Sequence, residues 1–193
     1  MTNIDSDVAG FFVTPISGLT TTEAGGRAHF TVVLNTQPLA DVTIALSSSN
    51  PSEGTVSPAS LTFTSDNWNI PQTVDVIGVN DPFDDGDIAF TIVTAAAISA
   101  DPGYNGLNPL DVSVINIDND TAGITVSPTF GLTTTESGGT ATFTIVLNSQ
   151  PTADVTIGLS FEQHVGGHRQ SGERDVHDRE LEHAADGHRH RGQ

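Results

Sequence analysis

The chain has 193 residues and carries 24 Asp and Glu against 6 Arg and Lys, a formal net charge of −18. This length allows one domain and part of another, and the charge excludes nucleic-acid phosphates and anionic lipid as main partners. The absence of Cys excludes disulfides and thiolate chemistry, and no apolar stretch is long enough for a membrane span or placed as in a signal peptide.

An internal repeat divides the chain. The sequence GLTTTE at residues 18–23 recurs at 131–136, and ADVTI at 40–44 recurs at 153–157, both displaced by 113 residues. NIDSD at residues 3–7 likewise matches NIDND at 116–120. We therefore expect four segments. They are the end of a preceding repeat at 1–7, a full repeat at 8–120, a truncated second repeat with the first three strands at 121–160, and a tail at 161–193.

Apolar and polar side chains alternate along short stretches of the full repeat, as in Ala28, Phe30, Val32 and Leu34. Such alternation predicts half-buried strands. The expected strands are 11–14, 28–34, 42–46, 61–63, 73–79, 90–92 and 112–114. Seven strands in a repeat of this size predict an all-β fold, an immunoglobulin-like antiparallel sandwich followed by an incomplete second copy.

Acidic residues gather in the connections between these strands. Asp81, Asp84, Asp85 and Asp87 follow the strand at 73–79, Asp118 and Asp120 follow the last strand, and Glu23 precedes the second. Antiparallel strands can bring these connections to one end, where the carboxylates repel one another. Two interpretations remain open: a calcium site, since calcium takes about six to eight oxygen ligands, or a solvated acidic rim that keeps the protein soluble.

Four short motifs carry a family resemblance. They are TEAGG at 22–26, PQTV at 71–74 leading into VND at 79–81, DDGD at 84–87, and IDND at 117–120. In this order on a sandwich pattern they resemble the Calx-beta repeat, over residues 8–120 and, as a truncated copy, 121–160. The resemblance implies a seven-stranded sandwich of adhesion and matrix proteins and of sodium/calcium exchangers, where it binds calcium.

The resemblance also implies a set of calcium ligands. They are Glu23, Asp81, one or more of Asp84, Asp85 and Asp87, and Asp118 with Asp120. This chain departs from the family at Asn80 and Asn119, which stand where aspartates are frequent, and at Glu53, the only acid in its loop. These departures favour one or two weaker sites over a multi-ion cluster.

The tail differs in composition from the rest of the chain. Residues 161–193 hold five of the six Arg and six of the seven His, among them His183, His188 and His190. These histidines could suggest a transition-metal site, but another explanation fits the repeat. Codons compatible with the tail, read one base later after Ser160, spell a sequence close to residues 48–80. We expect a frameshifted, disordered His/Arg-rich tail.

No residue pattern indicates catalysis. His29 is the only histidine before the tail and lies at an outward strand position, and no nucleophile motif is present. We expect a non-enzymatic, Ca²⁺-binding structural or adhesive module of a bacterial extracellular repeat protein, secreted or at the cell surface. Its partners would be neighbouring repeats and cell-surface or matrix ligands. The alternatives are an accessory domain of a secreted hydrolase, or a pseudogene product without function.

Overall fold

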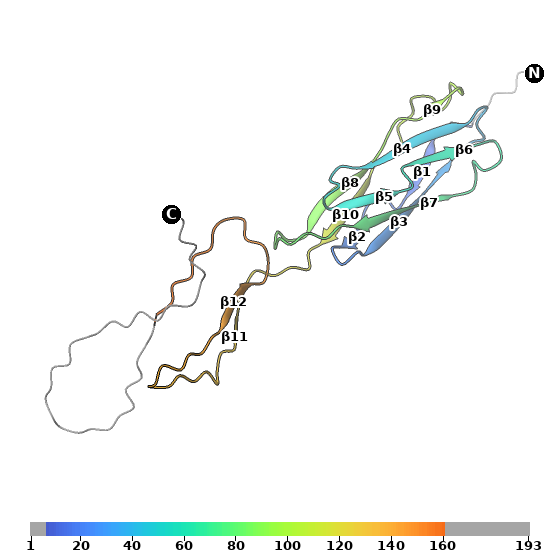
Figure 1. Ribbon diagram of the computed structural model, residues 1–193. Helices are drawn as coiled ribbons and strands as arrows, with labels where there is room; N and C mark the ends of the chain where they lie inside the picture. Colours follow the sequence, from blue (N-terminus) through green and yellow to red (C-terminus); the bar gives the residue numbers. More distant parts are fainter. Residues whose placement is uncertain (1–6, 161–193) are drawn as a thin grey trace, which may run out of the picture. The chain divides into compact units, whose positions relative to one another are not determined.

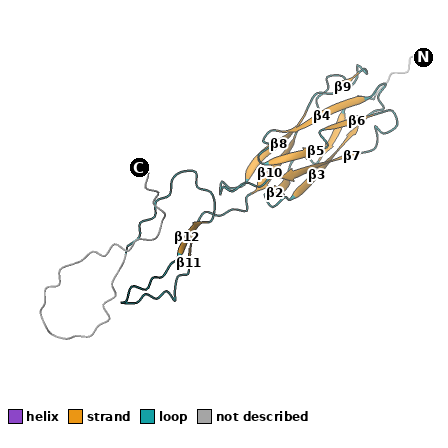
Figure 2. Cartoon of the chain, viewed as in Figure 1, coloured by secondary structure: helices purple, strands orange, loops and turns teal. Residues whose placement is uncertain are grey.

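The computed structural model describes residues 7–160. The expectations for residues 1–6, and for a disordered tail at 161–193, lie outside the described residues. The described part of the chain is all-β and contains no helix (Figure 2). Among these residues no helix capable of crossing a membrane is found. They divide into two units, the first made of residues 7–123 with Leu147–Gln150.

The first unit is a β-sandwich of ten strands (Figure 1). They are β1 (Phe11–Thr14), β2 (Leu19–Thr22), β3 (Arg27–Leu34), β4 (Val42–Ser48), β5 (Gly54–Ser57), β6 (Ser60–Phe63), β7 (Gln72–Gly78), β8 (Ile88–Thr94), β9 (Ile98–Ser99) and β10 (Val112–Ile117). One sheet has the order β1-β3-β7-β5. The other has the order β2-β10-β8-β4-β6, with β9 also paired to β4.

The core lies between the two sheets, because alternate side chains of each strand point inward. In β3 the side chains of Phe30, Val32 and Leu34 are buried while Arg27 and His29 are exposed. Each fully buried side chain of this kind contributes about 1.5–3 kcal/mol to stability. The core is lined by Val13, Phe30, Val32, Leu34, Val42, Ile44, Leu46, Leu61, Phe63, Val74, Val76, Phe90, Ile92, Ala97, Tyr104, Val112 and Val114.

Each of the seven predicted stretches coincides with a strand, although Val79 lies just beyond the end of β7, and the predicted number of strands is not confirmed. The structure adds β2, β5 and β9. Residues 19–22 read LTTT and residues 54–57 read GTVS, and each holds a single large apolar side chain. The third addition, β9, has two residues. Alternation is a weak signal in stretches this short, and these strands form because their neighbours offer backbone hydrogen bonds.

One pairing corrects the expectation of a purely antiparallel sandwich. The edge strand β2 runs parallel to β10, so that Leu19 lies opposite Val114 and Thr22 opposite Ile117. Residues 15–18 carry the chain from β1 in one sheet to β2 in the other. The sequence pattern fixes which side chains of a strand are buried, but not the direction of the strand beside it.

Beyond residue 123 the described residues contain two strands, β11 (Ile124–Ser127) and β12 (Thr144–Leu147), which form a two-stranded sheet. The prediction of three strands in 121–160 is therefore wrong for its last stretch, since residues 155–159 form no strand. In the first repeat the equivalent strand β4 pairs only with β6, β8 and β9. Residues 124–160 provide no equivalent of these partners.

Candidate metal centre

Two acidic residues leave the sheet side by side at one end of the first unit. Because β2 and β10 are parallel and both end at the pair Thr22–Ile117, the next residues, Glu23 and Asp118, are neighbours. The backbone N–H of Glu23 donates to the carbonyl oxygen of Ile117 at 3.1 Å, which continues the ladder by one step. The parallel pairing thus places the first two carboxylates of the site.

Two further loops reach the same end. Strand β8 is antiparallel to β10 and pairs Ile88 with Asn116, so the β7–β8 loop at residues 79–87 lies beside the end of β10. In the other sheet, Gly54 at the start of β5 pairs with Gly78 at the end of β7. Glu53, which directly precedes β5, therefore lies beside the start of the β7–β8 loop.

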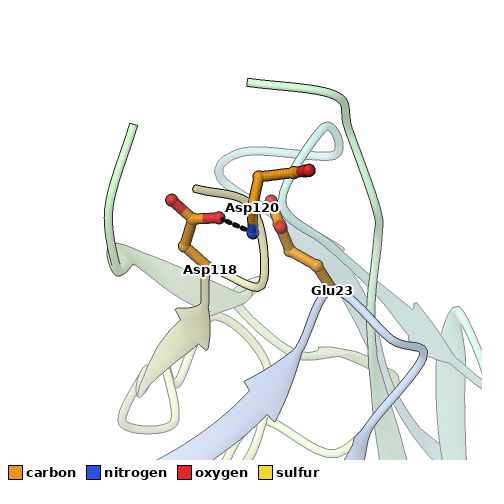
Figure 3. Close-up of side chains that lie close together, drawn as sticks. All are labelled: Glu23, Asp118 and Asp120. Atoms are coloured by element: carbon orange, nitrogen blue, oxygen red, sulfur yellow. Dashed lines mark hydrogen bonds between the residues drawn. The ribbon is translucent and has the colours of Figure 1, made fainter. Parts of the chain in front are cut away.

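The first carboxylate group consists of Glu23, Asp118 and Asp120, each of which offers an oxygen within 4.8 Å of the others (Figure 3). Glu23 is 3% exposed, and its Oε2 accepts a hydrogen bond from the backbone N–H of Asn119 at 3.1 Å. Asp118 accepts from two backbone N–H groups, that of Asp120 at Oδ1 and that of Gly86 at Oδ2, both at 2.7 Å. Backbone donors therefore fix the direction of both carboxylates.

The second carboxylate group consists of Glu53, Asp81 and Asp85, whose ligand oxygens also lie within 4.8 Å of one another. Glu53 is 6% exposed, whereas Asp85 is exposed on the surface of the loop. The Oδ1 of Asp81 accepts from the backbone N–H of Phe83 at 2.9 Å, which closes a tight turn in the loop. This group, like the first, combines one buried glutamate with two aspartates that solvent can reach.

Asn116 is a buried polar residue of β10 that holds Glu53 in place. Its Nδ2 donates to Oε2 of Glu53 at 3.2 Å and to the carbonyl oxygen of Val79 at 3.1 Å. Its Oδ1 accepts from the Thr21 hydroxyl at 2.9 Å. A buried amide with its hydrogen bonds satisfied is stable in the core and sets the position of the buried carboxylate.

Asp84 and Asp87 belong to neither group. The Oδ2 of Asp84 accepts from the backbone N–H of Ala122 at 2.6 Å, and Oδ1 of Asp87 accepts from the backbone N–H of Asp118 at 3.1 Å. Both side chains thus tie the β7–β8 loop to the segment that follows β10. Both residues are predicted as ligands from the sequence, but in the structure they hydrogen-bond to the backbone of that segment and belong to neither carboxylate group.

The pKa values of Glu23 and Asp118 shift in opposite directions, because burial dominates at Glu23 and backbone hydrogen bonds dominate at Asp118. Burial raises the pKa of Glu23 above 4.5, and the charges of Asp118 and Asp81 add to this effect, against the hydrogen bond from Asn119. The backbone N–H groups of Asp120 and Gly86 lower the pKa of Asp118 below 3.8. Loss of hydration, with the charges of Asp81 and Asp118, raises the pKa of Asp85 above 3.8.

The donor set suits a hard cation. All six side chains of the two groups are carboxylates, and oxygen ligands select calcium, magnesium or manganese over softer metals. Arg27 is the only Arg or Lys between residues 7 and 160, so this region holds almost no cationic side chain to offset the acids. Free carboxylate oxygens and water could complete the shell of a calcium ion.

Five of these six carboxylates are among the ligands predicted from the sequence, and Glu53 is not. The position of Glu53 follows from counting the connections between strands, because odd-numbered connections lie at one end of the sandwich and even-numbered ones at the other. In a sandwich of seven alternating strands, the first, third and fifth connections and the segment after the last strand all lie at one end. Glu23, Glu53 and Asp81 belong to those three connections, and Asp118 follows the last strand.

No family model matches the chain, and no curated protein sequence matches it. Similar solved structures include the apo-form Calx CBD1 domain, with 16% identity, a TM-score of 0.46 and coverage of 59% of this chain and 100% of that one. Another is the periplasmic chaperone SfaE, with 12% identity, a TM-score of 0.45 and 57% of this chain covered. The chain spans 58% of SfaE. The calcium-binding domain CBD12 of CALX1.1 has 17% identity, a TM-score of 0.42 and coverage of 56% and 44%.

Proposed function

We propose that the first unit is a calcium-binding structural module of the Calx-beta-like, immunoglobulin-like kind. The observation that carries this proposal is the convergence of two carboxylate groups at one end of the sandwich, each with a buried glutamate. Calcium would be held by Glu23, Asp118 and Asp120 in one group and by Glu53, Asp81 and Asp85 in the other. The ion supplies the positive charge that this part of the chain lacks.

The burial of Glu23 and Glu53 favours a cation over a solvated acidic rim. A rim that serves solubility places its carboxylates in water, where their charges are hydrated and screened. Here the two glutamates are 3% and 6% exposed, and the pKa of Glu23 is raised by burial and by neighbouring acids. Burying a charge is costly unless it is paired, and a divalent ion shared among three carboxylates offsets that cost.

The place of the site suggests its role. Asp118 and Asp120 belong to the segment through which the chain leaves the sandwich, and Asp84 holds that segment at Ala122. Calcium bound here would stiffen the exit toward the neighbouring repeat. We propose a non-catalytic spacer or adhesive module of a secreted or cell-surface repeat protein, with neighbouring repeats and cell-surface or matrix ligands as its partners.

Thermal unfolding of the full chain tests calcium binding. We expect the melting temperature to rise with calcium, by an amount equivalent to about 2.7 kcal/mol at 100 times the dissociation constant. Magnesium should give a smaller rise, because its stricter octahedral geometry fits a loop-built site less well. Equal melting temperatures with calcium and with chelator would favour the solvated rim.

Single substitutions test whether each carboxylate group binds one calcium ion. Titration calorimetry should give two calcium ions per chain, and Glu23→Gln and Glu53→Gln should each remove one of them. The matched control is Asp41→Asn, because Asp41 is an exposed acid just before β4, whereas Glu53 lies beyond the other end of that strand. If both glutamate variants bind calcium as the unaltered chain does, the carboxylate groups are not the ligands.

A further inference from the structure

Residues 121–160 repeat residues 8–47 with 27 identical residues of 40, and they also reproduce local structure. In the first copy the N–H of Gly26 donates to the Thr22 hydroxyl at 3.1 Å. In the second, Gly139 donates to Thr135 at 2.9 Å. The hydroxyl of Thr144 donates to the carbonyl oxygen of Ser127 at 3.1 Å, as the equivalent Thr31 does to Thr14 at 3.4 Å. At this turn and at this pair of strands, the second copy thus has the same local conformation as the first.

The strands present in the second copy are those whose partners lie in the same half. β11 matches β1, and β12 matches the part of β3, Thr31 to Leu34, that pairs with β1. The stretch equivalent to β2 forms no strand, and in the first copy β2 pairs with β10 alone. The stretch equivalent to β4 forms none either, and β4 pairs with β6, β8 and β9. Residues 124–160 therefore contain strands equivalent to the first half of a module and none equivalent to the second half.

The core side chains of the second copy are uncovered. Phe143 and Ile157 are 42% and 39% exposed, whereas their equivalents Phe30 and Ile44 are fully buried. Strands of the second half cover those equivalents in the first copy. The covering side chains are Leu61, Phe63, Val74, Val76, Phe90, Ile92, Val112 and Val114. In the described part of the chain, the strands that carry these side chains are already buried in the first unit.

We infer that residues 121–160 are an open half-module that binds the complementary half of a module of this repeat on another polypeptide. That partner carries strands with the sequence of residues 48–117. It would pair with the backbone of residues 132–135 as β10 does with β2, and with residues 155–160 as β6 and β8 do with β4. A second copy of residues 121–160 offers an apolar face but no equivalents of those strands. The inference does not rest on calcium binding.

Complementation in trans tests this inference. A polypeptide of residues 48–117 is diluted from urea into the folded full chain, and the mixture is examined by size-exclusion chromatography with light scattering. We expect a one-to-one complex and protection of residues 121–160 from protease. Phe143→Asp should weaken binding by on the order of 100-fold, because a large core side chain is lost and a charge is buried. Ile157→Asp should do the same and serves as a second variant.

Val146→Asp is the matched control, since the equivalent Val33 is half-exposed on β3 and not part of the core. It should bind the polypeptide as the unaltered chain does. If binding survives both Phe143→Asp and Ile157→Asp, the added polypeptide has replaced residues 48–117 of the first unit instead of binding residues 121–160. That result would overturn the inference. So would a chain that dimerises through residues 121–160 by itself, a monomer in which these residues are already protected, or the absence of a complex.

Discussion

The side-chain amide of Asn116 donates a hydrogen bond from Nδ2 to Oε2 of Glu53 across 3.2 Å, and both residues are buried. This contact joins the last strand of the sandwich to the loop that precedes β5. The same amide also donates to the carbonyl oxygen of Val79 and accepts from Thr21, so it ties Glu53 to the start of the β7–β8 loop and to β2, the strand that precedes Glu23. A change at Asn116 therefore tests how far the site depends on the fold beneath it.

Asn116→Asp should destabilise the calcium-free protein strongly at neutral pH. The substitution removes two hydrogen-bond donors and places a second carboxylate against Glu53. An unsatisfied buried group costs about 1–3 kcal/mol, and the like charge adds to this. We expect the free energy of unfolding in urea to fall by at least about 3 kcal/mol at pH 7, with partial recovery near pH 4, where a protonated carboxyl can donate.

The control for this variant is the same Asn→Asp substitution at an exposed position. Asn69 is exposed, so Asn69→Asp should change stability by less than about 0.5 kcal/mol. Equal losses in the two variants, or a loss at Asn116 that does not depend on pH, would show that the buried amide does not position Glu53.

The pKa of Glu23 predicts a pH dependence for the calcium-free protein. Since the folded pKa lies above the ordinary value of 4.5, the native state holds the proton more tightly than the unfolded state. Stability should therefore fall as pH rises from about 4.5 through the folded pKa. Glu23→Gln removes this loss, keeps an acceptor for Asn119, and should be more stable than the unaltered chain at pH 7. Calcium should reverse that order.

The pKa of Asp118 predicts the opposite pH dependence of stability. Its folded pKa lies below 3.8, so its contribution to stability is present above pH 3.8 and is lost as pH falls through the folded pKa. Asp118→Asn should lower stability at pH 7 and leave it unchanged at the lowest pH. Urea unfolding at a series of pH values measures both variants, and parallel curves for the two would contradict the assignment of these pKa shifts.

Much of the sandwich follows from its apolar alternation. The pattern at Phe30, Val32 and Leu34 predicts both a strand and its buried face, because one face of each strand must be covered. The same pattern is weak at Leu19–Thr22, where one apolar residue stands among threonines. That strand forms through its pairing with β10, and such pairing depends on residues far away in the sequence.

The sequence predicts the end of the sandwich at which the site lies better than it predicts the residues that form the site. Counting connections places Glu23 and Asp118 at one end, and the structure brings them within reach of one ion. Asn116 follows Val112 and Val114 at the same spacing of two, so its burial was readable from the sequence. Its bond to Glu53 was not, because the two residues lie 63 positions apart and meet only across the sandwich.

The tail leads to a prediction about the gene. If one extra nucleotide follows the Ser160 codon, its removal restores Ser-Ser-Asn, as at residues 48–50 of the first repeat, and then the rest of the module. Resequencing the locus measures this directly. A tail whose codons do not reproduce residues 48–80 in the shifted frame would contradict the frameshift, and His183, His188 and His190 would then return as metal ligands to be tested.

The two copies of the repeat allow the same side chain to be compared where the second half of the module covers it and where it is exposed. Phe30 and Phe143 occupy the same position of the repeat, yet Phe30 is fully buried and Phe143 is 42% exposed. Replacing a buried phenylalanine with alanine removes its contacts and leaves a cavity, which costs about 3–5 kcal/mol. Truncating an exposed one changes stability by less than about 0.5 kcal/mol.

We therefore expect Phe30→Ala to lower the melting temperature of the full chain steeply, and Phe143→Ala to leave it nearly unchanged. Fluorescence of Trp68, which packs against the core of the first unit, reports the transition. Comparable losses in both variants would mean that residues 121–160 are covered in solution and stabilise the first unit. A loss confined to Phe30 shows that the same side chain contributes to stability only where the second half of the module closes over it.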